Sequence, residues 1–223
     1  MSMGRIPVFS HPSGDWRPTW RGRIHAVALL CTIPAGAVLA LLTPSGLARI
    51  AVAIYVVSLM ALYSTSASYH LFTRSYRAQR TMQQLDHAMV YVLIAGTYTP
   101  VCLLGLPSPL RWIFLAAIWG MAAVGMGLKV AWRARRTAAA LYLVIGWAVI
   151  AVLPWAQSRT GWFSLTLYAL GGVIYTVGAV LFYLKRPRLR PLVFGYHEVW
   201  HVMTVVAAVL QFAALGVLVA RVA

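Results

Sequence analysis

Acidic residues are nearly missing from this chain: its 223 residues include only 3 Asp and Glu, against 19 Lys and Arg. Charged residues of both signs together make up 10% of the sequence, whereas soluble domains carry about a quarter. With 61% hydrophobic residues, the chain holds more apolar side chains than a water-soluble core of this size can bury. A water-soluble domain is therefore excluded, and lipid is expected to solvate much of the surface.

Cysteine is scarce as well. Cys31 and Cys102 each lie inside an apolar run, so they are interpreted as small apolar side chains and do not indicate a redox compartment. Residues 1–24 contain three prolines and no apolar core, so no cleavable signal peptide is expected there. We predict that 1–24 form a cytoplasmic N-terminal arm, disordered or lying on a surface.

Long apolar runs are abundant instead. A helix needs about 20 mostly apolar residues to cross the hydrocarbon layer of a membrane. Turn or charge signals separate seven such runs: 25–42, 50–72, 85–104, 110–128, 138–155, 162–184 and 196–220. The sequence therefore predicts an all-α membrane protein, a seven-transmembrane helix bundle over 25–223 in which short loops make successive helices antiparallel neighbours.

The basic residues are strongly biased to one side of this predicted bundle. Fifteen of the 19 Lys and Arg lie in the N-terminal arm and in the second, fourth and sixth loops, and four lie on the other side. The positive-inside rule then places the N-terminus in the cytoplasm and the C-terminus outside. Basic residues in short loops between apolar runs indicate contact with anionic lipid headgroups, and no nucleic-acid partner is expected.

Ionisable residues are costly within membrane spans, and several of them gather here at span ends. They are His70, Asp86, His87, His197, Glu198 and His201. In the predicted topology the second helix ends at the cytoplasm, whereas the third and seventh helices begin there. Three helices therefore bring polar groups to one depth on the cytoplasmic side. The topology was derived from Lys and Arg alone, so this convergence of other residues supports it independently.

The spacing His197-x-x-x-His201 puts two imidazoles on one helical face, about 6 Å apart along the axis. Such a pair alone indicates a metal only weakly, but His70 at matching depth supplies a third imidazole. Three neutral imidazoles and a water form an open tetrahedral zinc site, in which the water becomes acidic enough to act as a nucleophile. Asp86 could hold that water or orient a histidine, and Ser66 could donate a hydrogen bond to a developing oxyanion.

Each of these residues also has a simpler interpretation. The three histidines could be interfacial side chains that contact only headgroups. Asp86 could cap the third helix or pair with an Arg of the second loop. Ser66 could bond its own backbone.

The other polar residues match the site less well. His87 follows Asp86 directly, so its side chain points about 100° away from Asp86 around the helix axis, which makes it a poor additional ligand of the metal. Glu198 faces away from the histidine pair for the same reason and is interpreted as a first-turn carboxylate or an arginine partner. His11 and His25 have no matching partners in the sequence.

Three stretches resemble the bacterial hemolysin III family: 66–72 (SASYHLF), 85–100 (LDHAMVYVLIAGTYTP) and 196–201 (YHEVWH). That family belongs to one superfamily with the progestin and adiponectin receptors and the alkaline ceramidases. The resemblance covers nearly the whole chain, because the number of spans, the orientation and the order of the motifs all match. Each motif alone is unspecific, but their combination is specific.

The resemblance implies a role for each candidate residue. His70, His197 and His201 match the three zinc-binding histidines, so Zn²⁺ is the implied cofactor. Asp86 matches the aspartate near the zinc-bound water, and Ser66 matches the serine one turn before the first histidine. Similarity to ceramidases implies hydrolysis of a lipid amide, the hemolysin name implies lysis on overproduction, and a bacterial inner membrane is the implied location.

Two functions of different classes follow. The first is zinc-dependent hydrolysis of a lipid amide or ester at the cytoplasmic side, with Asp86 shuttling the proton and Ser66 assisting the oxyanion. The second is a non-enzymatic regulator, receptor-like protein or lytic protein, whose structural zinc ties the second, third and seventh helices together. Membrane lipids are the expected partners in both cases. A transporter or light-driven pump is disfavoured, because the seventh span has no lysine for a retinal Schiff base and no midplane charge pairs mark an ion path.

Overall fold

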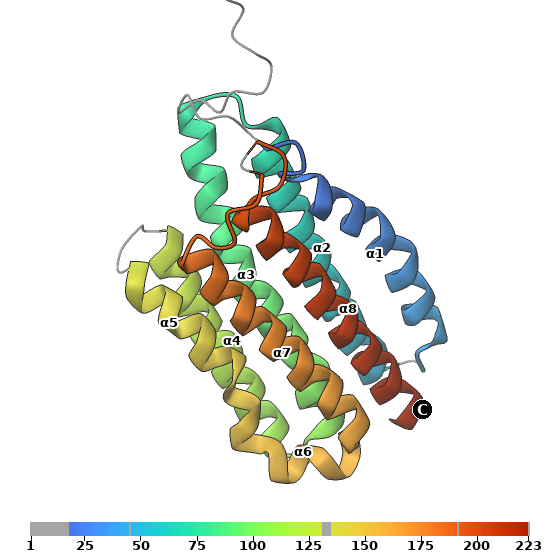
Figure 1. The fold of residues 1–223 in the computed structure, drawn as a ribbon. Coiled ribbons are helices and arrows are strands. Elements are labelled where there is room, and N and C mark those ends of the chain that lie inside the picture. Colours follow the sequence, from blue (N-terminus) through green and yellow to red (C-terminus); the bar gives the residue numbers. More distant parts are fainter. Residues whose placement is uncertain (1–17, 45, 131–134, 191, 223) are drawn as a thin grey trace, which may run out of the picture.

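The computed structural model describes residues 18–44, 46–130, 135–190 and 192–222, and helices dominate these ranges (Figure 1). They are α1 (Arg23–Leu42), α2 (Leu47–Phe72), α3 (Tyr76–Gly105), α4 (Leu110–Val130), α5 (Arg135–Gly146), the short 3-10 helix η1 (Ala148–Val152), α6 (Leu153–Thr160), α7 (Trp162–Tyr183) and α8 (Tyr196–Val222). Seven helical stretches in the described ranges are long and apolar enough to cross a membrane. The predicted seven-helix membrane bundle is confirmed. The greater part of the predicted N-terminal arm, residues 1–17, lies outside the described ranges.

The third helix begins earlier than the apolar pattern predicts. It starts at Tyr76, where the side chain of Ser75 caps it by accepting a hydrogen bond from the backbone N–H of Ala78 at 3.2 Å. The expected start at 85 was wrong, because hydropathy detects only the part of a helix that suits lipid. Residues 76–84 are polar but include good helix formers such as Arg, Ala, Gln and Met. Asp86 therefore lies in the third turn of α3, not in the first turn as predicted.

The fifth span is not the single helix over 138–155 that the sequence predicts. It comprises α5, η1 and α6, and the segment suited to a membrane runs over Ala140–Thr160. A proline stands in the first turn of α6, where its missing N–H costs nothing because first-turn N–H groups have no partner within the helix. Gly161, with a φ of +78°, ends this segment and leads directly into α7.

The helix α3 is the most enclosed of the spans: 72% of its most apolar 18-residue stretch is buried, against 44% or less for the others. It contacts α2, α4, α5, α6 and α8, which surround it. Gly96 of α3 lies directly against the Ser58 side chain of α2, so these two helices approach each other closely. Large apolar side chains such as Leu30 and Leu41 remain exposed on the outside, as expected for a surface that lipid covers.

Several helix ends that carry the candidate residues gather at one end of the bundle. The start of α1, the end of α2 and the starts of α3 and α8 lie together there, whereas the C-terminus lies at the opposite end (Figure 1). The short segment before α1 is held against the loop before α8, because Thr19 and Trp20 donate backbone hydrogen bonds to Leu192 and Val193. The side of the membrane that this end faces stays a prediction from the basic residues.

Candidate metal centre

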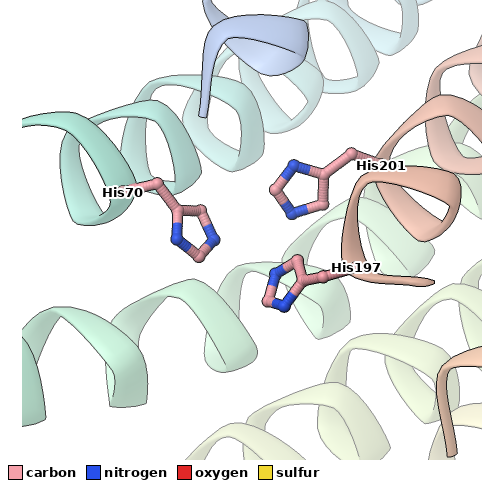
Figure 2. Close-up of side chains that lie close together, drawn as sticks. All are labelled: His70, His197 and His201. Atoms are coloured by element: carbon pink, nitrogen blue, oxygen red, sulfur yellow. The ribbon is translucent and has the colours of Figure 1, made fainter. Parts of the chain in front are cut away.

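Three histidines from two helices converge at this end of the bundle (Figure 2). His70 lies near the end of α2, and His197 and His201 lie in the first two turns of α8. Their ring centroids are 4.9 Å apart for His70 and His197, 5.1 Å for His70 and His201, and 4.8 Å for His197 and His201. One nitrogen of each ring lies within 4.8 Å of the others. This group can hold a metal ion.

The rings lie inside the protein. The exposed fraction is 6% for His70 and 2% for His201, and His197 is partly buried. The Nδ1 atom of His201 is buried and makes no hydrogen bond within the described part of the chain. Histidines that served only as headgroup contacts would face the exterior, so the burial speaks against the interfacial interpretation.

Ser66 and Asp86 form a second polar pair next to the histidines. Ser66 lies one turn before His70 on α2, and its side chain is buried. Its hydroxyl lies close enough to the Asp86 carboxyl of α3 to interact with it, although the contact does not meet the full distance and angle limits of a hydrogen bond. The pair therefore links α3 to the turn of α2 that carries His70.

The structure also tests the simpler roles of these two residues. Asp86 does not cap α3, since Ser75 has that role. The ion pair found among the described residues joins Arg21 to Glu198 and does not involve Asp86. The Ser66 hydroxyl makes no hydrogen bond to its own backbone. What remains is the contact between the two side chains.

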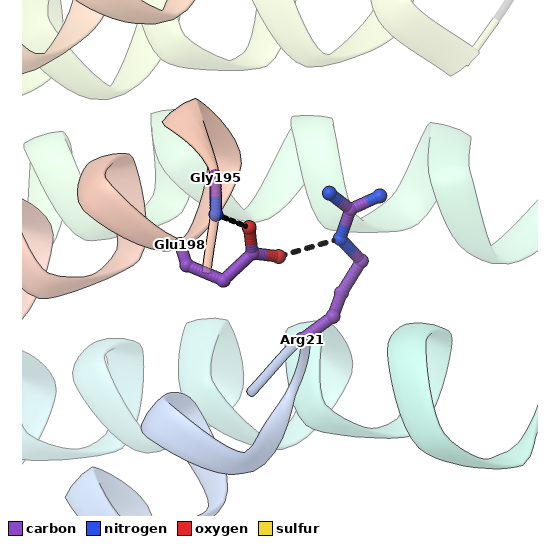
Figure 3. Close-up of polar contacts among 3 residues, drawn as sticks. All are labelled: Arg21, Gly195 and Glu198. Carbon is purple, nitrogen blue, oxygen red and sulfur yellow. Dashed lines mark hydrogen bonds and ion pairs between the residues drawn. The ribbon is translucent and has the colours of Figure 1, made fainter. Parts of the chain in front are cut away.

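Glu198 is fully buried, and both of its carboxylate oxygens accept a hydrogen bond (Figure 3). The backbone N–H of Gly195 donates to one oxygen at 2.7 Å, and Nε of Arg21 donates to the other at 2.8 Å. The interpretation of Glu198 as a first-turn carboxylate and arginine partner is confirmed. This pair anchors the segment before α1 to the start of α8, one residue from His197.

The sequence offered no partner for His25, but the structure places it at the cluster. Its ring is 3% exposed and stacks on the ring of His201, with centroids 4.1 Å apart and planes 11° from parallel. Its position in the first turn of α1, at the same end of the bundle as His201, was the available sequence signal. Among the described residues, His87 is not part of the group of histidines whose nitrogens lie close together.

Comparison with known proteins finds relatives along most of the chain. A family model described as "Haemolysin-III related" matches residues 16–212. Hemolysin-3 of Bacillus cereus is 34% identical over 194 residues, covering 84% of this chain and 85% of that protein. A Hemolysin-3 homolog of Bacillus subtilis (strain 168) is 32% identical over 183 residues, covering 79% and 82%. The rice (Oryza sativa subsp. japonica) "Heptahelical transmembrane protein ADIPOR2" is 28% identical over 184 residues, covering 74% and 80%.

Proposed function

This chain belongs to the haemolysin-III-related family, and on that basis we propose that it binds zinc and hydrolyses an amide or ester bond of a membrane lipid. The observation that carries the proposal is the convergence of His70, His197 and His201 inside a membrane bundle. The proposed site faces the cytoplasm, as the bias of the basic residues predicts. The two Bacillus relatives support the plasma membrane of a bacterium as the location.

The donor set supports zinc as the metal. Three imidazoles are a common ligand set of catalytic zinc, which keeps its fourth position open. Zinc–nitrogen bonds of about 2.0–2.1 Å would put the three nitrogens about 3.3 Å apart. The nitrogens now lie within 4.8 Å of one another, so small rotations of the rings that bring them closer by about an ångström would suffice. The orientation of the rings adds to the fit, because Figure 2 shows one nitrogen of each ring directed toward the other two rings.

The chemistry divides between the metal and the chain. When bound, zinc would act as a Lewis acid and would make a water acidic enough to lose a proton near neutral pH and become a nucleophile. In this proposal one Oδ atom of the Asp86 carboxylate takes a proton from the attacking water and later gives it to the leaving nitrogen or oxygen. The Ser66 hydroxyl donates a hydrogen bond to the substrate carbonyl oxygen as negative charge builds there. The contact between Ser66 and Asp86 allows both roles in sequence: the one hydroxyl proton of Ser66 faces the Asp86 carboxylate at first, and it can turn to the substrate once Asp86 carries a proton and itself donates to Oγ of Ser66.

The depth of the cluster supports a lipid as the substrate. His70 lies two residues before the end of α2, and His197 is the second residue of α8. The cluster is therefore at the end of helices that are long enough to cross a membrane. Amide and ester bonds of lipids lie between the acyl chains and the headgroups, which is the depth at which such helices end.

Metal content is the first experiment. We would measure zinc by mass spectrometry in detergent-purified wild type and in His197→Ala/His201→Ala, with zinc supplied throughout purification. The wild type should hold about one zinc per chain, and the double variant should hold none. Ser75→Ala is the control, because Ser75 caps α3 and is not one of the three grouped histidines, so its loss should leave the zinc in place. A folded wild type without zinc would contradict the proposal.

Turnover then separates hydrolysis from metal binding alone. Asp86→Asn should keep its zinc but lose about 10²–10⁴-fold in the rate of fatty-acid release from N-acyl lipids in mixed micelles, because the amide cannot take up the proton. Released fatty acid would be quantified by mass spectrometry. Wild-type turnover in Asp86→Asn, or a zinc-loaded wild type that leaves lipid amides and esters intact, would contradict the hydrolase.

A second candidate function is non-enzymatic. Two of the relatives are called Hemolysin-3 and Hemolysin-3 homolog, which favours a lytic or regulatory membrane protein with a structural zinc. The three histidines would then link α2 to α8, while α3 contributes none of them. In this case Asp86→Asn should behave as the wild type, and purified protein should release dye from lipid vesicles only while the histidines are intact.

A further inference from the structure

His25 is enclosed by aromatic rings from two other helices. Its imidazole stacks on His201 of α8 at 4.1 Å between centroids, and it also contacts the tilted ring of Tyr63 of α2 at 5.0 Å and 45°. Neither of its ring nitrogens makes a hydrogen bond of full geometry within the described part of the chain. The best-defined contact of this buried imidazole is therefore the stacked ring of His201, beside whose backbone it also lies.

The stacked geometry excludes His25 as a ligand of the same ion. The lone pair of an imidazole nitrogen lies in the ring plane, so an ion bound by His201 lies near the plane of that ring. The plane of His25 is 11° from parallel to it, and the two ring centroids are 4.1 Å apart in the stack. The lone pairs of His25 are therefore directed into a different plane. Accordingly, His25 does not belong to the group of nitrogens that lie within 4.8 Å of one another.

The segment that carries His25 is fixed in place by other contacts. Arg21 pairs with the buried Glu198 of α8 at 2.8 Å. Gly22 has a φ of +82°, and a Cβ atom there would lie 2.7 Å from the Cβ of His70, so its backbone packs directly against that histidine. The backbone N–H groups of Thr19 and Trp20 donate hydrogen bonds to carbonyls of the loop before α8. Residues 19–25 thus form one side of the histidine cluster, in contact with His70 of α2 and His201 of α8.

We propose that His25 is a positioning residue of the metal centre, which holds the ring plane of His201 by stacking and does not ligate the metal. The inference rests on the metal binding proposed above and adds a fourth histidine, from α1, to a site otherwise built from α2 and α8. Residues that orient metal ligands influence affinity by about 10–100-fold when they are removed. Here the orienting contact is a ring face, not the usual hydrogen bond to the second nitrogen.

Cobalt binding tests this role without any measurement of activity. Co²⁺ would be titrated into metal-free, detergent-purified full-length protein, and the visible absorption bands would report both the affinity and the coordination geometry. His25→Ala removes the ring, His25→Leu fills its volume without a flat face, and His25→Phe keeps a flat ring without nitrogens. Thr32→Ala is the matched control, since Thr32 is buried on α1 two turns deeper and bonds only the backbone of Ala28.

We expect His25→Phe and Thr32→Ala to match the wild-type spectrum and affinity. His25→Ala and His25→Leu should bind Co²⁺ at least about tenfold more weakly, with shifted or weakened bands that indicate a distorted site. His201→Ala should lose the spectrum altogether. If one of the two ring-less variants fails to fold, as judged by helical circular dichroism, the other carries the comparison with His25→Phe.

Two outcomes would overturn the inference alone. One is wild-type affinity and spectrum in His25→Ala or His25→Leu. The other is a His25→Phe variant as defective as the ring-less ones, which would show that the nitrogens matter and not the ring face. A folded wild type that binds neither Co²⁺ nor zinc would overturn the proposed function as well, so the two failures are distinguishable.

Discussion

At the scale of single residues, the ion pair between Arg21 and Glu198 has unequal partners. The Glu198 side chain is completely buried, whereas 24% of the Arg21 side chain is exposed. Removing Arg21 leaves a buried carboxylate with one N–H donor, from Gly195. Removing the charge of Glu198 leaves an arginine that can still reach solvent.

Arg21→Gln should therefore destabilise the protein by about 3 kcal/mol, and Glu198→Gln by only about 1–2 kcal/mol. The double variant should cost less than the sum of the two, because neither charge is then left alone. Thermal unfolding of the three variants in one detergent, followed by circular dichroism, measures the difference. Equal losses in the two single variants would contradict the asymmetry.

Gly22 offers a second prediction at the same scale. Gly22→Ala combines a left-handed backbone, which costs about 1–2 kcal/mol, with the close approach to His70. Gly46 is the matched control: its φ is +85°, but a Cβ atom there would meet nothing within 4 Å.

Gly22→Ala should lower both the melting temperature and the affinity for zinc, since it displaces the helix end that carries His70. Gly46→Ala should lower only the melting temperature. Calorimetry and metal titration of the two variants side by side check this, and unchanged zinc affinity in Gly22→Ala would refute it.

At the scale of the helices, the contact between α2 and α3 depends on Gly96. A Cβ atom there would overlap with the Ser58 side chain, so Gly96→Ala must push the two helices apart. The expected loss is about 1–3 kcal/mol. Gly120→Ala on α4 meets open space and should be tolerated.

The second change Ser58→Gly should restore much of the stability that Gly96→Ala removes, because it deletes the overlapping atoms. Melting temperatures of the single and double variants in the same micelles provide the test. If Ser58→Gly only adds to the damage, the close approach is not the cause.

The helices also show which parts of the fold and site the sequence could predict. Hydropathy located the spans, and helical spacing brought His197 and His201 to one face. Hydropathy could not locate the polar first turns of α3, since helix formation there depends on the Ser75 cap and on local helix propensity. The sequence did not predict the contact between His25 and His201 either. Short loops determine which helices are neighbours in sequence, but they do not determine which side chain of α1 contacts which side chain of α8.

At the scale of the whole molecule, orientation is the main open prediction. The basic residues place the N-terminus and the histidine cluster in the cytoplasm and the C-terminus outside. Alkaline phosphatase, which is active only outside the cytoplasm, should be active when fused after Val222 and inactive when fused in the loop after Tyr183. A fluorescent protein that folds in the cytoplasm should give the opposite pattern at both points. An active phosphatase at the loop would invert the topology and move the cluster to the outer face.

The positions of the three histidines along the chain also have a consequence for biosynthesis. His70 belongs to α2, and His197 and His201 belong to α8, which is made much later. While the ribosome is still producing the intervening helices, His70 waits in the bilayer without the other two, and a chain that stops short of α8 never acquires them. A metal that needs all three histidines could therefore be acquired only after α8 has inserted, so its uptake would report that α2 and α8 have come together.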